Sequence, residues 1–375
     1  MNEKQDVKQV VCGFGNLYKA MRISKKNVVW KDSVASYVKN GLVNCYKLKK
    51  QHETGTYKID DYTVFKVHEP KERDIVSTRI KDRVFQRSFC DNYLYKTVTR
   101  SFIHDNGACQ IGKGTDFSRE RLAHHLKEHY KGNGLVGGIL KCDISDYFGS
   151  TSHEVAKDAL RKRIKDDWAM QEAARIIDSF TQGKDPAKGM GLGSQVTQII
   201  QLAVLDGIDH MIKEELGIKH YVRYMDDFIL IHQDIEYLRY CRERIRAELD
   251  KKGLRLSPKK TQVQPVTQPV HFLGFSFRLN ENGRVTMRIL PEKVSHERRK
   301  LRRLVGLAKA GVKTRAEVDK CYEAFRAHAK KGDNRGVVRK MDKFYENLWE
   351  EHQNETSHNQ GTTHGGTSNA RSPRG

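Results

Sequence analysis

The stretch HYVRYMDDFILIHQ, residues 220–233, decides the fold class. Two short runs rich in aromatic and aliphatic residues flank the letters MDD, a pattern that predicts two antiparallel strands joined by a tight turn. Asp226 and Asp227 would then occupy the tip of the hairpin. Because an acidic pair in a hairpin is often ordinary turn chemistry, this motif needs a second one before it indicates a reaction.

A second acidic motif precedes the hairpin. The run GGILKCDISDYF, residues 137–148, predicts a strand that ends in acidic residues. An aspartate such as Asp143, taken alone, is more often a helix cap or a turn residue. If the two strands lie side by side in one sheet, Asp143 joins Asp226 and Asp227 in a cluster of carboxylates. Such oxygens bind magnesium, and two ions about 3.5–4 Å apart serve nucleotidyl transfer.

The rest of the chain predicts a mixture of helices and short strands. Residues 1 to about 60 are expected to be largely helical, and Tyr57 to Ile80 predicts a small antiparallel sheet with a turn at HEPKER. Asp234 is expected to cap the helix that follows the hairpin. The residues expected in the core of the N-terminal helices are Trp30, Tyr37, Leu42 and Tyr46.

Length and charge indicate the class of partner. A chain of 375 residues exceeds the usual ~100–200 of one domain, which predicts two or three subdomains. Lys and Arg total 69 against 47 Asp and Glu, a net charge of +22 that suits a polyanion such as nucleic acid. Charge alone leaves open a merely soluble or ribosomal protein.

Cysteine spacing and hydropathy limit the alternatives. The seven cysteines form no CxxC pair, so neither a zinc module nor a disulfide framework is expected, and a reducing cytoplasm fits. The N-terminal residues lack the apolar run of a signal peptide, and about 18 consecutive apolar residues occur nowhere. A cytoplasmic protein without membrane contact is therefore predicted.

The acidic motifs resemble those of a known family. YMDD between two apolar strands, after a strand that ends in DISDYF, resembles the palm of reverse transcriptases. KERDIVSTRIKDRVFQ, residues 71–86, looks like the fingers motif of bacterial enzymes of the group II intron type, and FLGF, residues 272–275, resembles the primer grip. The resemblance implies an α+β right-hand polymerase fold with fingers, an antiparallel palm and a helical thumb.

The resemblance also implies a division of the chain and a metal site. Its expected regions are a helical lead-in at 1–56, fingers and palm at 57–290, a basic thumb-like region at 291–352 and a disordered tail at 353–375. Asp143 and Asp226 would hold two Mg²⁺ ions, for which Mn²⁺ could substitute. Asp227 would contribute to the same cluster, and the metal-binding positions include Ile144.

Further roles carry over by position. Phe148 matches the aromatic steric gate that crowds a 2′-hydroxyl and so favours deoxynucleoside triphosphates. Arg73 matches the arginine that contacts the incoming triphosphate, with Lys71 and Arg83 as weaker candidates. Lys260 resembles the lysine near the leaving pyrophosphate, although Lys259 beside it leaves the register open. Each of these residues could instead be a core aromatic or a solvated charge.

Two segments concern the primer and the nucleotide. Phe272, Leu273 and Gly274 look like the primer grip, although a buried hairpin would have the same letters. In GMGLGSQVTQ, residues 189–198, Leu192 takes the place of a glutamine that many bacterial relatives have near the incoming nucleotide.

The same segment points to a subtype. LGSQVTQ, which ends at Gln198, resembles an element of diversity-generating retroelement enzymes, with Thr197 departing from its serine. The loop CQIGKGTDF, residues 109–117, looks like another segment of that group. An apolar Leu192 cannot hydrogen-bond a base or sugar edge, so low copying fidelity is the hypothesis.

Several alternatives stay open at this point. A phage-defence reverse transcriptase fits the same motifs, and a non-catalytic RNA-binding protein could keep a polymerase-like fold. The intact Asp143, Asp226 and Asp227 set favours catalysis, and YMDD with Phe148 disfavours an RNA-dependent RNA polymerase. No HNH-like cluster of a maturase and no VTG element of a retron enzyme is evident.

The implied partners are nucleic acids. They comprise a template RNA, a DNA or RNA primer, the RNA–DNA hybrid and deoxynucleoside triphosphates, and a diversity-generating enzyme would also need a small accessory protein. The basic region from Glu292 to Lys343 would contact the backbone of the primer–template duplex.

Overall fold

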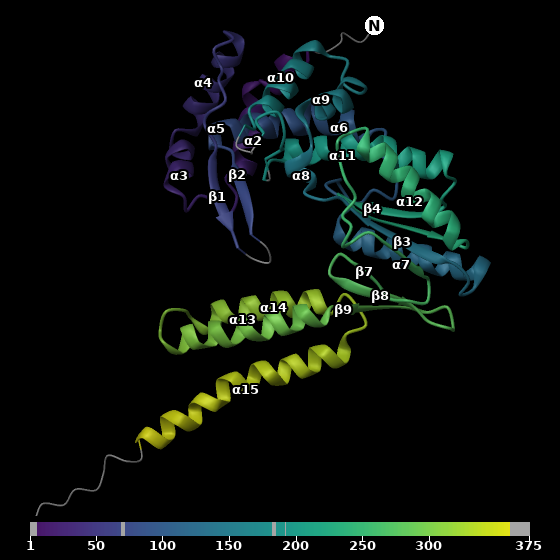
Figure 1. Ribbon diagram of the computed structural model, residues 1–375. Helices are drawn as coiled ribbons and strands as arrows, with labels where there is room; N and C mark the ends of the chain where they lie inside the picture. Colours follow the sequence, from purple (N-terminus) through teal and green to yellow (C-terminus); the bar gives the residue numbers. More distant parts are fainter. Residues whose placement is uncertain (1–5, 69–71, 182–184, 192, 361–375) are drawn as a thin grey trace, which may run out of the picture. The chain divides into compact units, whose positions relative to one another are not determined.

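The computed structural model describes residues 6–68, 72–181, 185–191 and 193–360. By their contacts the residues divide into two compact units, Met1–Val266 and Thr267–Gly375. Figure 1 labels most of the helices and strands of both units. Among the helices of the described ranges, none combines the length and the apolar composition that a membrane crossing requires.

The first unit begins with helices, as predicted. These are α1 (Val7–Val11), α2 (Phe14–Ser24), α3 (Asp32–Lys39) and α4 (Gly41–Glu53).

The expected core of this region was largely wrong. Trp30, Leu42 and Tyr46 are exposed. Tyr37 is partly buried and packs against the main core. The reason lies in the phase of α4, whose buried face carries Cys45 and Leu48. Leu42 and Tyr46 fall on the other face of the same helix.

A two-stranded sheet follows and confirms the predicted hairpin. Strands β1 (Thr63–Val67) and β2 (Arg73–Ser77) pair antiparallel, with Thr63 opposite Ser77. The chain then continues through α5 (Ile80–Phe89), the π-helical turn η1 (Cys90–Leu94) and α6 (Tyr95–Thr99).

The main sheet of the first unit has four antiparallel strands in the order β4-β5-β3-β6. Alternate side chains of β3 and β5, among them Leu140 and Phe228, enter the main hydrophobic core. Helices α7 (Thr115–Asn133) and α12 (Ile235–Asp250) lie on opposite sides of the sheet (Figure 1). The strands are β3 (Gly138–Asp143), β4 (His220–Tyr224), β5 (Asp227–His232) and β6 (Gln262–Pro265).

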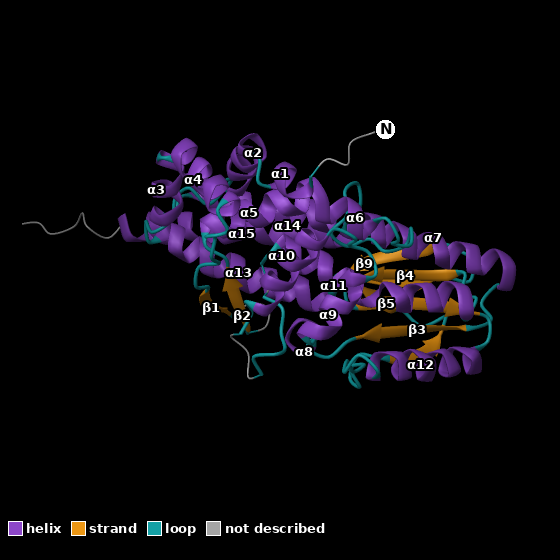
Figure 2. Ribbon diagram, turned by 90° about the horizontal axis from the view of Figure 1, so that it is seen from above, coloured by secondary structure: helices purple, strands orange, loops and turns teal. Residues whose placement is uncertain are grey.

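Further helices gather beyond the end of the sheet at which β3 terminates (Figure 2). The most buried of them is α11, whose side chains contact α9, α5 and α6. Asp234 caps α12, as predicted, by accepting hydrogen bonds from the backbone of Glu236 and Tyr237. The helices are α8 (Tyr147–Ser150), α9 (His153–Arg161), α10 (Asp167–Asp178), α11 (Gln195–His210) and the π-helical turn η2 (Met211–Glu215).

The second unit combines a three-stranded sheet with three helices. The helices share a core that includes Leu301, Leu304, Tyr322, Met341 and Tyr345. The elements are β7 (Val270–Phe272), β8 (Phe275–Leu279), β9 (Val285–Ile289), α13 (Pro291–Lys309), α14 (Arg315–Ala329) and α15 (Arg335–Gln360).

Two features bear on the predicted regions. Residues 57–290, which were expected to form the fingers and palm, contain most of the first unit and the start of the second. Helix α15 continues to Gln360, eight residues into the segment that was expected to be disordered, and residues 361–375 lie outside the described residues. The mixture of helices with antiparallel sheets confirms the predicted α+β class.

Candidate active site

Strand pairing brings two of the predicted carboxylates together. Strands β3 and β5 run antiparallel, and their register places Asp143 directly opposite Asp227. Side chains of directly opposed residues lie on the same face of a sheet, about 4.5–5.5 Å apart at Cβ. Asp226 lies in the turn of the β4–β5 hairpin, directly before Asp227. All three carboxylates therefore belong to residues at the same end of the sheet.

The turn that carries Asp226 has an unusual backbone. The tight hairpin is confirmed, but its tip differs by one residue from the prediction: Tyr224 pairs with Asp227, so Met225 and Asp226 form the turn and Asp227 is the first residue of β5. Met225 has φ of 56°, in the left-handed region that non-glycine residues seldom adopt. Such a conformation costs of order 1–3 kcal/mol and persists only where surrounding contacts hold it.

Asp143 is held by a lysine that the sequence had singled out. The Nζ atom of Lys260 lies 2.7 Å from both carboxylate oxygens of Asp143. The backbone supports this arrangement, because the Ser257 N–H donates to the Asp143 carbonyl over 2.7 Å. The carboxylate of Asp143 is 11 % exposed, whereas the Lys260 side chain is half exposed.

The surroundings of Asp227 disfavour the ionised form of its carboxylate. Burial, together with the neighbouring carboxylates of Asp143 and Asp226, raises its pKa to about 7, although Lys141 and Lys260 oppose the shift. Its Oδ1 atom is buried without a hydrogen-bond partner, and Lys141 Nζ lies 3.8 Å away. A carboxylate in this state would be stabilised by a further cation.

The three residues fit a divalent metal by chemistry. Their donors are hard carboxylate oxygens, which Mg²⁺ prefers, and the buried Oδ1 of Asp227 has no competing hydrogen bond. Within the described ranges, however, no three His, Cys, Asp or Glu side chains are already arranged around a common metal position. The ammonium group of Lys260 lies next to the Asp143 carboxylate in this structure.

The structure describes Ile144 and Phe148, two of the residues expected near the metal ions and the nucleotide. Ile144 follows Asp143 and forms an isolated antiparallel bridge with Leu256. Phe148 is half-buried, 5.9 Å from the ring of Tyr147, and its carbonyl accepts a hydrogen bond from the Met190 N–H over 2.7 Å. The structure thus brings Phe148 next to the segment that leads to Leu192, which itself lies outside the described residues.

Gln198 lies in the first turns of α11. Its Oε1 atom accepts a hydrogen bond from the Cys109 thiol over 3.4 Å. Cys109 belongs to the loop that also contains Lys113, so the two segments that indicated the subtype are neighbours in the fold.

The fingers residues are described unevenly. Lys71 lies outside the described residues, and Arg73 pairs through its backbone with Val67 in the β1–β2 hairpin. Arg83 donates to the Ser77 hydroxyl and the Thr78 carbonyl, and burial lowers its pKa. It lines an open pocket of about 920 Å³ together with other basic residues, namely Lys31, Arg79 and Lys81.

The expected primer grip is a tight turn in the second unit. Phe272 pairs with Phe275, so Leu273 and Gly274 form a two-residue turn with φ of 45° and 86°. Phe272 is fully buried. The positive φ of Gly274 favours glycine by conformation, whereas a Cβ atom there would meet only the flexible end of the Lys293 side chain.

Arg223 and Asp209, which the sequence motifs did not indicate, form a fully buried ion pair between β4 of the hairpin and α11. A signal for it was present. Arg223 lies in an apolar strand run and Asp209 in an apolar helix, and charges at such positions are seldom fully buried unless they pair.

Comparison with known proteins gives a family. The sequence profile described as "Reverse transcriptase (RNA-dependent DNA polymerase)" matches residues 73–277, more than half of the chain. No curated protein sequence matches the chain.

Solved structures of low identity are similar to it. Telomerase from Candida albicans in complex with a fragment of telomeric RNA is 11 % identical, with a TM-score of 0.47 over 72 % of this chain and 55 % of that one. Apo telomerase from Candida tropicalis is 13 % identical, with a TM-score of 0.44 over 59 % and 47 %. A form of the latter without its C-terminal domain gives 12 % and 0.45 over 60 % and 55 %. The chain spans about half the length of these telomerase chains.

Proposed function

Because the chain belongs to the reverse transcriptase (RNA-dependent DNA polymerase) family, we propose that it is an RNA-directed DNA polymerase that extends a primer at Asp143, Asp226 and Asp227. The observation that carries the proposal is the register of β3 and β5, which places Asp143 opposite Asp227 beside the turn that contains Asp226. Nucleotidyl transfer needs such a cluster of hard oxygen donors.

Asp143, Asp226 and Asp227 would hold two Mg²⁺ ions, with Ile144 as an adjoining metal-binding position and Mn²⁺ as a substitute. When bound, the ions supply charge stabilisation at the attacking and leaving oxygens. The raised pKa of Asp227 supports this assignment, because nearby positive charge is needed to keep all three carboxylates ionised. Lys260, whose ammonium group contacts Asp143, is proposed as the proton donor to the leaving pyrophosphate.

Side chains around the cluster would select and orient the nucleotide. Phe148, fixed against Tyr147, would exclude a 2′-hydroxyl, and Leu192 and Gln198 would contact the nucleotide or the template base.

The triphosphate and the primer would be held by other residues. Arg73, Lys71 and Arg83 are proposed for the triphosphate, since guanidinium and ammonium groups form charge-assisted hydrogen bonds with phosphate. Phe272, Leu273 and Gly274 are proposed for the primer end.

The proposed macromolecular partners are a template RNA, a DNA or RNA primer and the RNA–DNA hybrid that forms between them. Helix α13 supports this proposal, because it carries seven Lys or Arg residues against two Glu. Basic side chains contact the backbone without reading sequence, and a hybrid of A-like form is recognised by shape.

The biological role we propose is error-prone copying in a diversity-generating retroelement, with a small accessory protein as partner. Leu192, Gln198 and the loop at Cys109 support it by resemblance, and Gln198 contacts Cys109 directly. A phage-defence enzyme is the alternative. Sequencing of the products distinguishes the two: errors concentrated at one template base support diversity generation, and evenly low error rates contradict it.

The polymerase itself is tested by primer extension on an RNA template with deoxynucleotides and Mg²⁺. The purified chain should extend the primer, whereas Asp226→Ala/Asp227→Ala should not. RNA binding by the same variant separates this from the second candidate, a non-catalytic RNA-binding protein. If the wild type binds RNA and does not extend any primer, even with its own template RNA added, the catalytic proposal fails.

A further inference from the structure

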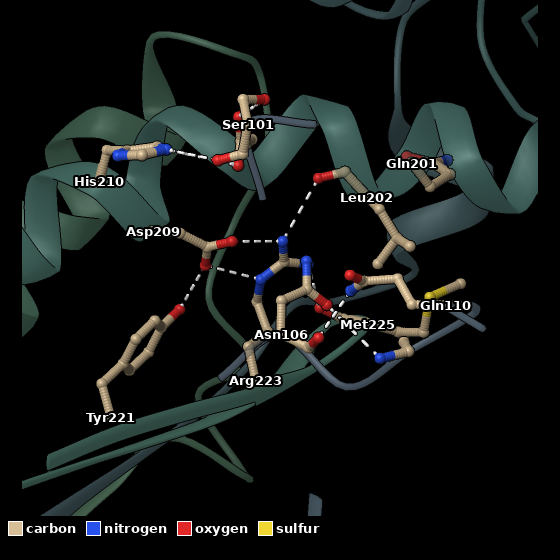
Figure 3. A network of polar contacts seen from close by, with 12 residues as sticks. Ser101, Asn106, Gln110, Gln201, Leu202, Asp209, His210, Tyr221, Arg223 and Met225 are labelled. Atoms are coloured by element: carbon tan, nitrogen blue, oxygen red, sulfur yellow. Dashed lines mark hydrogen bonds and ion pairs between the residues drawn. The ribbon is translucent and has the colours of Figure 1, made fainter. Parts of the chain in front are cut away.

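A buried ion pair joins the metal-binding hairpin to helix α11. Arg223 of β4 is 1 % exposed and Asp209 of α11 is fully buried. The guanidinium group of Arg223 donates to both carboxylate oxygens of Asp209, from Nε over 2.7 Å and from Nη2 over 2.5 Å. The Tyr221 hydroxyl donates to the same carboxylate over 2.6 Å, as Figure 3 shows.

The remaining donors of Arg223 reach the backbone on both sides. Nη2 donates to the carbonyl of Leu202 on α11 over 3.3 Å. Nη1 donates over 2.9 Å to the carbonyl of Met225, the residue of the turn with the left-handed backbone (Figure 3). One guanidinium group thus connects α11 to the turn that carries Asp226.

The bond to Met225 acts directly on the predicted metal ligand. The Met225 carbonyl belongs to the same rigid peptide plane as the Asp226 nitrogen. Fixing that oxygen therefore restricts the rotation of the plane from which the Asp226 side chain projects. The strand itself is held as well, because the Arg223 N–H donates to the Asp105 carbonyl and the Gly107 N–H donates to the Arg223 carbonyl, each over 3.0 Å.

Stability does not account for such a pair. Removing two charges from water costs several kcal/mol per ion, and an apolar pair of similar volume is often as stable or more so. The left-handed Met225 adds a local cost of order 1–3 kcal/mol. Both features are consistent with a geometric role.

We propose that Arg223 is a positioning residue of the reaction: anchored on Asp209, it holds the Met225–Asp226 peptide plane so that the Asp226 carboxylate keeps its metal-binding orientation. This inference rests on the proposed function. It assigns Arg223 no contact with substrate.

Two variants test the inference without leaving a buried charge unpaired. Arg223→Lys keeps the positive charge but loses the planar fork, so it cannot contact Asp209 and the Met225 carbonyl together. Arg223→Met/Asp209→Leu replaces the pair by apolar groups of similar volume.

The chain offers a matched control on the same helix. Asp206 is 1 % exposed, lies one turn before Asp209, and pairs with Arg163. The Asp206 carboxylate also accepts a hydrogen bond from the Ser101 hydroxyl and lies 3.8 Å from Nε2 of His210. The side chain of Arg163 donates to Asp206, Ser101 and Ala159. Arg163→Met/Asp206→Leu therefore removes a similar ion pair without touching the Arg223–Met225 contact.

The readouts are kcat, the KM for deoxynucleotide, the Mg²⁺ concentration at half-maximal rate, the melting temperature and direct Mn²⁺ binding by electron paramagnetic resonance. Both Arg223 variants should lose about tenfold or more in kcat, because small misplacement of a catalytic group costs up to about 100-fold. Their Mg²⁺ requirement should rise several-fold and their Mn²⁺ binding should weaken, with KM and RNA binding little changed. The control pair should keep the wild-type kcat and metal requirement.

Contrary results are distinguishable. If the Arg223 variants keep the wild-type kcat and metal requirement, or if they and the control lose activity only in proportion to melting temperature, the positioning role is wrong while the polymerase stands. If the wild type neither extends a primer nor binds more Mn²⁺ than Asp226→Ala/Asp227→Ala, the proposed function is wrong and this inference falls with it.

Discussion

The ammonium group of Lys260 lies 2.7 Å from both oxygens of Asp143, one of the carboxylates proposed to bind metal. By resemblance, Lys260 is also expected near the leaving pyrophosphate. The two roles are compatible, since a half-exposed lysine can exchange one anionic partner for another. Loss of Lys260 should therefore have opposite effects on the two properties: tighter metal binding and slower catalysis.

Lys260→Met should tighten Mn²⁺ binding, because it removes the cation that competes for Asp143. The same variant should lose about 100-fold in kcat if Lys260 donates a proton to the leaving group. Electron paramagnetic resonance and single-turnover primer extension measure the two effects. Lys259→Met, the exposed neighbour, is the control, and equal effects in both variants would contradict the assignment.

His52 gives a prediction for the pH dependence of stability. It is 4 % exposed, and its ring lies 4.2 Å from the rings of both Tyr57 and Phe85. Burial and the nearby Arg175 lower the pKa of His52 to about 3. Since the unfolded chain has a histidine pKa near 6.5, the unfolded state binds the extra proton between these values, and acid destabilises the fold.

His52→Phe should remove this dependence and keep the aromatic contacts. The wild type is expected to lose roughly 2 kcal/mol more than the variant between pH 7 and pH 5, at about 1.4 kcal/mol per pKa unit. Urea unfolding at both pH values measures the difference. Equal losses in the two proteins would show that His52 is not the group that titrates.

Among the secondary-structure elements, the β3–β5 pair is the one on which the site depends. Its register places Asp143 opposite Asp227, and a shift by one residue would move the two carboxylates to opposite faces of the sheet. Gly137 stands at the entry to β3 with φ of 112°. A Cβ atom there would lie 2.3 Å from the carbonyl oxygen of His232, at the end of β5.

Gly137→Ala should therefore destabilise the first unit by roughly 2–4 kcal/mol, through backbone strain and a clash with backbone atoms that cannot move aside. Gly132→Ala, in α7 with open space around it, should be neutral or stabilising by up to about 1 kcal/mol. Thermal unfolding followed by circular dichroism compares them. Similar melting temperatures for both variants would contradict the role given to the strand entry.

For the molecule as a whole, the dominant feature is charge. The net charge is +22, and exposed Arg299 and Arg303 contribute to it on α13. Affinity for nucleic acid should fall steeply with salt, since each neutralised phosphate releases counterions. Fluorescence anisotropy with a primer–template duplex measures this dependence.

Arg299→Gln/Arg303→Gln should reduce the slope of log affinity against log salt by roughly 2, about one per lost phosphate contact. Arg239→Gln/Arg246→Gln, which removes two exposed arginines of α12 that pair with Glu236 and Glu243, is the matched control. An equal loss of slope in both variants would mean that α13 is not a preferred contact surface.

Much of the local structure followed from the sequence. Strand periodicity and turn residues predicted the β4–β5 hairpin and the Asp234 cap, because each depends on residues that are close in the chain. The expected burial of Leu42 and Tyr46 failed, because apolar residues occur on more than one face of α4 and composition does not say which face meets the core.

What the sequence determined by itself is thus the local conformation, the basic character and, by resemblance, the family to which the chain belongs. What only the tertiary structure decided is which distant groups meet: Asp143 with Asp227, Lys260 with Asp143, and Arg223 with Asp209. The physical reason is the distance along the chain over which each interaction acts. Periodicity and capping act over a few residues, whereas strand order and the pairing of buried charges depend on how whole elements pack.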